Sequence, residues 1–158
     1  MLVRLTELDT YEIAWAAAER CKYKRDLGIP NSKRVDQKRD DYQITREGMA
    51  GEWAVSKVLG VPVNVELYAA GDPGWDFEYC GFKIDVKTSR AQYLLFKTLS
   101  NFKADFAIFA KYVNDYQIDL AGIISRQDFV QKCELRDFGY GENYTMHPDD
   151  LMDIRDYL

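Results

Sequence analysis

The stretch that decides the fold is Phe82-Lys83-Ile84-Asp85-Val86-Lys87-Thr88, in which apolar and charged residues alternate. A period of two is typical of a β-strand with one buried face, because successive side chains of a strand point to opposite sides. We therefore expect Phe82, Ile84 and Val86 to face a core. Asp85 and Lys87 then lie side by side on the other face.

The segment just before this strand, Gly74-Trp75-Asp76-Phe77-Glu78, is separated from it by the turn residues Cys80-Gly81. This spacing predicts a hairpin of two strands, over residues 75–79 and 82–88. Asp76 lies near the open end of the hairpin, where it can approach Asp85. The local sequence alone therefore brings two carboxylates and one ammonium group together.

A fourth polar group comes from a helix that we expect from about Asp41 to Leu59, ended by Gly60 with Pro62 beyond it. Glu52 shares its helix face with three apolar residues, Met49, Val55 and Leu59. A carboxylate on an apolar face is costly to bury unless it is paired or bound to a cation.

Two glycines precede Glu52 in this helix, and each lowers helix stability by roughly 1 kcal/mol relative to alanine. Gly48 and Gly51 therefore predict close packing of the helix against the sheet or the substrate. Glu47 lies about 140° around the helix from Glu52, at ~100° per residue, and ranks below it as a site residue.

The rest of the chain predicts helices at both ends and further strands between them. A helix over 6–26 would bury the stripe Leu5, Leu8, Tyr11, Trp15 and Ala18, and a polar loop would cover 28–40. Strands are expected over 61–67, 104–113 and 117–124. The capping pattern Ser125-Arg126-Gln127-Asp128 would open a helix to about Leu135. His147-Pro148 would begin a short last helix that buries Leu151, Ile154 and Leu158, with His147 as its cap and not as a catalytic residue.

This order of elements predicts an α/β fold with a central mixed β-sheet flanked by helices. We expect one domain over 1–158: a helical N-terminal part to about residue 60, a sheet core over about 61–124, and a helical C-terminal part over 125–158. The chain length of 158 residues and its 47% apolar content fit a single core.

The sequence has no apolar run long enough to span a membrane, and its first residues lack the pattern of a signal peptide. Cys21, Cys80 and Cys133 have neither zinc-site spacing nor a disulfide framework. We expect three reduced, partly buried thiols in a cytoplasmic protein.

The formal net charge of −5 is unusual for a protein that binds nucleic acid, but the charges are unevenly distributed. Residues 19–46 hold nine basic and five acidic side chains, whereas 134–158 hold seven acidic and two basic ones. A chain with one basic region can still present a positive face to phosphates. The acidic tail is interpreted as a solvated surface.

Glu52 within Gly51-Glu52-Trp53-Ala54-Val55, then Asp76, then Asp85-Val86-Lys87, resembles the PD-(D/E)xK nuclease superfamily. The resemblance is strongest to small phage or prokaryotic endonucleases and to Holliday-junction resolvase-like members, and it covers about residues 44–125. It implies a restriction-endonuclease-like core and Mg²⁺ or Mn²⁺ as cofactor. Glu52, Asp76 and Asp85 would be metal ligands, and Lys87 the catalytic lysine.

The match departs from the family pattern at one point, because the literal Pro-Asp pair is absent. Asp72-Pro73 runs in the opposite order, and Asp76 follows Trp75, so Asp72 is the alternative first aspartate. A second copy of the tripeptide pattern, Asp36-Gln37-Lys38, lies in a polar stretch without strand character and is interpreted as chance.

The chemistry of phosphodiester cleavage fits this set of residues. Carboxylates can hold metal ions that activate water and neutralise phosphate, and a lysine beside them can orient or deprotonate the water. Thr88, Ser89 and Arg90, directly after the lysine, are candidates for contacts with the substrate phosphate. The alternative for Asp85 and Lys87 is an exposed salt bridge of under ~1 kcal/mol.

The sequence therefore predicts a magnesium-dependent deoxyribonuclease, an endonuclease, whose partner is DNA. The alternative function is a catalytically inactive nuclease-like fold that binds DNA or a protein. A homodimer is a hypothesis that follows from the need to cut two strands and not from any residue.

Overall fold

A mixed sheet of five strands forms the centre of the computed structural model, which describes residues 1–29, 38–68, 73–139 and 141–157. The strand order is β1-β6-β5-β3-β2, in which β3 and β5 run parallel and the other neighbours antiparallel. The strands are β1 (Leu2–Arg4), β2 (Phe77–Tyr79), β3 (Phe82–Ser89), β5 (Phe106–Asn114) and β6 (Gln117–Ser125). The predicted α/β class and mixed central sheet are confirmed.

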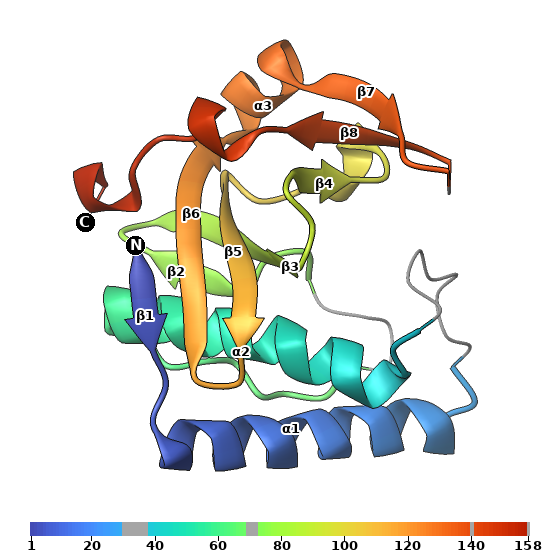
Figure 1. The fold of residues 1–158 in the computed structure, drawn as a ribbon. Helices are drawn as coiled ribbons and strands as arrows, with labels where there is room; N and C mark the ends of the chain where they lie inside the picture. The colour runs from blue at the N-terminus through green and yellow to red at the C-terminus, as the bar shows by residue number, and fades with distance from the viewer. Residues whose placement is uncertain (30–37, 69–72, 140, 158) are drawn as a thin grey trace.

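Two long helices cover one face of this sheet (Figure 1). α2 (Asp41–Leu59) packs against the strands, and α1 (Glu7–Asp26) lies on the far side of α2. The backbone amide of Gln43 donates to the Asp40 side chain at 2.7 Å, and Gly60 ends α2 with φ of 68°. That left-handed conformation suits glycine, as the sequence predicts.

The other face carries a second, antiparallel sheet of three strands, β4 (Leu94–Phe96), β8 (Glu142–Met146) and β7 (Glu134–Asp137). The short helix α3 (Arg126–Lys132) and three 3-10 turns accompany it: η1 (Leu99–Asn101), η2 (Pro148–Asp150) and η3 (Ile154–Asp156). Phe96 stacks on Phe102 with ring centroids 4.6 Å apart, and Phe129 packs against both rings. An apolar core thus lies on each face of the main sheet.

The prediction of a helical C-terminal part is wrong, because β7 and β8 occupy much of it. α3 begins as predicted, with Ser125 accepting from the Asp128 amide at 3.0 Å, but it ends at Lys132. Cys133 is already extended, and β7 starts at Glu134. His147 does cap the 3-10 turn η2; Ile154 is buried and Leu151 half-buried, while Leu158 lies outside the described residues.

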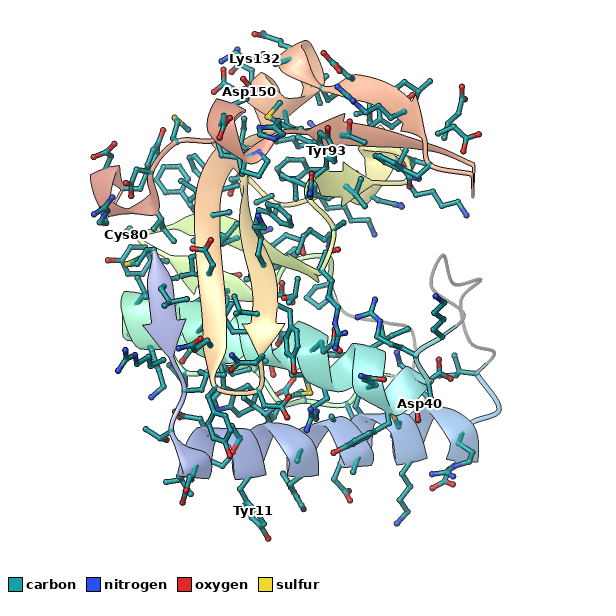
Figure 2. The ribbon with its side chains drawn as sticks, viewed as in Figure 1. Tyr11, Asp40, Cys80, Tyr93, Lys132 and Asp150 are labelled. Atoms are coloured by element: carbon teal, nitrogen blue, oxygen red, sulfur yellow. The ribbon has the colours of Figure 1, made fainter. Side chains whose placement is uncertain are left out.

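The stripe predicted to be buried on α1 is also largely wrong. Leu8, Tyr11 and Trp15 are exposed to 66%, 73% and 59%, and Figure 2 shows Tyr11 pointing away from the protein. The buried residues of α1 are Ile13, Ala16 and Ala17, on a different side of the helix. Small side chains on this side let α1 approach α2 closely, which a search for large apolar residues overlooks.

Three smaller predictions also need correction. Residues 61–67 form no strand; Val61 and Val63 pack on the core without strand pairing. Phe82 begins β3 but is 52% exposed, with its ring edge against Phe106. Cys80 is exposed at the hairpin turn, although all three cysteines are free thiols as expected.

None of the helices in the described ranges has the length and apolar character that a membrane crossing requires.

Candidate active site

The predicted hairpin places Asp76 directly beside β3. Phe77 pairs with Ile84, and the Asp76 backbone amide donates to the Ile84 carbonyl at 2.8 Å. The Asp76 side chain then turns onto the neighbouring strand, where its Oδ2 accepts the Val86 amide at 2.6 Å. The carboxyl group of Asp76 is therefore fixed against the backbone that follows Asp85, as the spacing predicts.

Asp85 and Lys87 lie next to each other on β3, on the sheet face opposite α2. Ile84 and Val86 enter the core beneath α2, whereas Lys87 lies 5.4 Å from the ring of Phe96 in the second sheet. Asp85 is only 5% exposed, so the alternative of an exposed surface salt bridge does not describe this pair.

The contact between these two side chains satisfies only part of the Asp85 carboxylate. Lys87 Nζ donates to Oδ1 at 2.7 Å and also lies 2.6 Å from Oδ2. The approach to Oδ2 lacks hydrogen-bonding geometry, and this buried oxygen has no hydrogen-bond partner among the described residues. A buried carboxylate oxygen in this state favours a further positive ligand.

Glu52 reaches the site from α2, held close to the sheet by Gly51. A Cβ added at Gly51 would lie 1.9 Å from Thr88 Oγ1, so the predicted close packing is confirmed there. A Cβ at Gly48 would meet nothing within 4 Å, so close packing does not explain that glycine. Glu52 is 9% exposed, and its Oε1 lies 3.7 Å from a guanidinium nitrogen of Arg20 on α1.

Asp76 is the electrostatic centre of the group. Burial, followed by the charges of Glu52 and Asp85, raises the pKa of Asp76 to about 8, and Lys87 only partly opposes this shift. Asp76 therefore lies within electrostatic reach of Glu52 on α2 and of Asp85 and Lys87 on β3. Arg20 beside Glu52 and Lys87 beside Asp85 offset part of this negative charge, and a divalent cation would offset more.

The three candidate carboxylates do not form a complete metal-binding arrangement in this structure. In the described ranges, no three acidic, histidine or cysteine side chains are arranged to hold a metal ion. The donor set still fits Mg²⁺ or Mn²⁺ in chemistry, because both prefer carboxylate oxygens. The buried Oδ2 of Asp85 and the raised pKa of Asp76 also fit such a cation. Asp72, the alternative aspartate, lies outside the described residues.

A cavity of about 120 Å³ opens beside Glu52 and Asp76. Its other walls include Arg20, Tyr23 and Lys24 from α1, and Trp75 before β2. Sequence reasoning did not assign these four residues to the site. The basic character of residues 19–46 indicated a possible contact with phosphates, but the sequence did not show that α1 lies next to Glu52.

The three residues after Lys87 have mostly internal partners. Thr88 donates to the Gly48 carbonyl at 3.2 Å, and Ser89 Oγ accepts from the Ala91 amide at 2.9 Å. Arg90 donates to both carboxylate oxygens of Glu47, at 2.6 and 3.1 Å. Their predicted contact with substrate phosphate stays a prediction, and Arg90 is already committed to an ion pair.

Glu47, which ranked below Glu52, belongs to a separate buried ion-pair cluster. It is 3% exposed and pairs with Arg39 as well as Arg90. α2 thus carries one glutamate paired with two arginines and another at the candidate site.

Comparisons of the chain with family models, with curated proteins and with solved structures find no match, so its functional assignment depends on the geometry of the site itself.

Proposed function

We propose that this protein is a metal-dependent nuclease that hydrolyses DNA phosphodiester bonds, with a restriction-endonuclease-like core similar to that of the PD-(D/E)xK superfamily. One observation carries the proposal: the half-buried Asp76 is repelled by two buried carboxylates, Glu52 and Asp85, and Lys87 lies against Asp85. A purely structural cluster would gain stability from neutral or fully paired side chains, so carboxylates that repel one another favour a function that requires a cation.

Each residue would have a distinct role. Asp76 and Asp85 would hold the cation, with Asp76 kept in place by the Val86 amide. Glu52 would bind a second cation or a metal-bound water. When bound, Mg²⁺ or Mn²⁺ would supply charge neutralisation at the phosphate and a lowered pKa for the attacking water.

As an ammonium group, Lys87 would orient that water and offset charge on the phosphate in the transition state; to accept the proton of the water it would first have to lose one of its own. Its ammonium group is suited to this role because it is about 39% exposed at the side chain while its carboxylate partner is 7% exposed. General-base and electrostatic contributions of this kind are each worth roughly 10²- to 10³-fold in rate.

The proposal is tested with supercoiled plasmid and branched DNA, each incubated with Mg²⁺, Mn²⁺, Ca²⁺ or EDTA. We expect cutting in Mg²⁺ or Mn²⁺, and binding without turnover in Ca²⁺. Lys87→Ala should lose at least about 10²-fold in cutting rate. Lys111→Ala, in the neighbouring strand β5 opposite Ser89, removes the same charge from the same sheet and should cut normally.

A second candidate function is a nuclease-like fold that binds DNA or a protein without cutting. The observation in its favour is that the described carboxylates are not already arranged to hold a metal ion. Binding of DNA with no cutting under any of the four conditions would favour this function and contradict the nuclease. Neither binding nor cutting would contradict both.

A further inference from the structure

The cavity beside Glu52 has a basic side and an acidic side. Arg20 and Lys24 line it from α1, and Glu52, Glu66 and Asp76 line it from α2, from the segment after α2 and from the start of the hairpin. The cavity volume of about 120 Å³ is small, so we assign to it a single phosphate group. Such a group needs positive partners on one side and, in the proposed reaction, a cation on the other.

Two of the three carboxylates of this cavity are recessed. Glu52 is 9% exposed and Asp76 is half-buried, whereas Glu66 is exposed. A phosphate must come within direct contact of a cation held there. The backbone of an unpaired strand can bend into such a recess, whereas a stiff duplex presents its phosphates on a broad convex surface.

Aromatic side chains lie beside the basic ones in the same cavity. Tyr23 is half-buried between Arg20 and Lys24 in sequence, and Trp75 is half-buried with Lys83 Nζ 3.9 Å from its ring centroid. Basic side chains with aromatic rings beside them for stacking are a common feature of sites that bind single strands without sequence preference.

We propose that this cavity binds one phosphate of a single-stranded DNA segment, next to the phosphodiester that is cut, with Arg20 and Lys24 as its phosphate-binding residues. This inference rests on the proposed nuclease function and narrows its substrate to unpaired or frayed strands. Arg20 would have a second role: its guanidinium lies 3.7 Å from Glu52, and a cation bound beside Glu52 would release it to contact the phosphate.

The test measures the binding of one fluorescent oligonucleotide, single-stranded or in a blunt duplex, by anisotropy in Ca²⁺ over a range of salt. We expect the single strand to bind about tenfold more tightly or better. Each phosphate contact on a single strand adds about 0.7 to the slope of log affinity against log salt. Arg20→Ala with Lys24→Ala should therefore reduce that slope by about 1.4.

The matched control is Lys22→Ala with Arg25→Ala, which removes two positive charges from the same helix end at exposed positions that do not line the cavity. This variant should keep the single-strand affinity and most of the slope. Equal losses of single-strand affinity in both double variants would show that binding depends on general charge attraction. That result would overturn the assignment of the cavity as the binding site.

Stacking has its own readout. In a protein with Trp15→Phe and Trp53→Phe, Trp75 is the remaining tryptophan of three. Single-stranded DNA should quench its fluorescence, and blunt duplex should not.

The two proposals fail in different ways. Duplex that binds as tightly as single strands, or unchanged Trp75 fluorescence, overturns the cavity assignment even if the protein cuts DNA. Absence of metal-dependent cutting overturns the nuclease, whichever form of DNA binds.

Discussion

Glu47 and Glu52 lie on the same helix, are similarly buried, and have different electrostatic surroundings. Glu47 pairs with two arginines, Arg39 and Arg90. Glu52 has one arginine, Arg20, at 3.7 Å, and it also acts with Asp85 on Asp76, whose pKa is raised to about 8 by burial and by these two charges. The first arrangement pairs its carboxylate on both sides and holds structure together. The second keeps carboxylates that repel one another, which a bound cation would relieve.

The largest effect should come from Asp85→Asn, which keeps the shape of the side chain but removes its charge. Cutting of plasmid DNA in Mg²⁺ should fall by about 10³-fold, because a metal ligand and the partner of Lys87 are lost together. The far-ultraviolet circular dichroism spectrum should be unchanged. Activity within tenfold of the parent protein would remove Asp85 from the reaction.

Glu47→Ala should affect stability instead of chemistry. Removing one partner from a buried ion pair destabilises a protein by roughly 3 kcal/mol, because the remaining charges lose their counter-ion. Urea unfolding measures this loss, and the folded fraction should still cut DNA. A stable Glu47→Ala protein without activity would reverse the roles assigned to the two glutamates.

Asp76→Asn should change how the stability of the protein depends on pH. The folded-state pKa of about 8 lies above the ordinary value of 3.8, so between these pH values the folded protein keeps a proton that the unfolded chain has lost. The stability of the parent protein in EDTA should therefore fall as pH rises from about 4 to 8.

The amide side chain introduced by Asp76→Asn is neutral, does not titrate and can still accept the Val86 amide. The stability of this variant should exceed that of the parent by on the order of 2 kcal/mol at about pH 8, and the two should converge near about pH 4. Parallel stability curves for the two proteins across this range would show that the pKa of Asp76 is not raised by burial and by the charges of Glu52 and Asp85.

Gly51→Ala and Gly48→Ala give the smallest effects and test how α2 presents Glu52. The added methyl at Gly51 meets Thr88 and forces a shift, so we expect a loss of about 1–2 kcal/mol. At Gly48 the space is open, and alanine should stabilise the helix by up to about 1 kcal/mol. Thermal unfolding compares the two, and equal effects would contradict the close approach of α2 at Gly51.

The position of Asp76 beside β3 in the candidate site could be predicted because it depends on short-range geometry. The turn at Cys80-Gly81 fixes the pairing of Phe77 with Ile84, and this pairing alone brings Asp76 beside β3. Glu52 could be selected because a carboxylate among Met49 and Val55 contradicts the apolar pattern of its helix.

The rest depends on long-range packing that the pattern does not contain. α1 buries Ala16 and Ala17 and exposes Tyr11 and Trp15, because the distance between two helices decides which face fits. β7 pairs with β8, and β8 pairs with β4, which is distant from both in the sequence. The two arginines that pair with Glu47 come from before α2 and from just after β3, so the sequence pattern did not predict these ion pairs.

The most direct test of the central claim is a calorimetric titration of Mn²⁺ into the DNA-free protein, compared with Asp85→Asn and Glu47→Gln. We expect saturable Mn²⁺ binding to the parent protein and to Glu47→Gln, and at least about a tenfold loss of affinity in Asp85→Asn. Equal Mn²⁺ binding by all three proteins, or no binding by any of them, would contradict that claim.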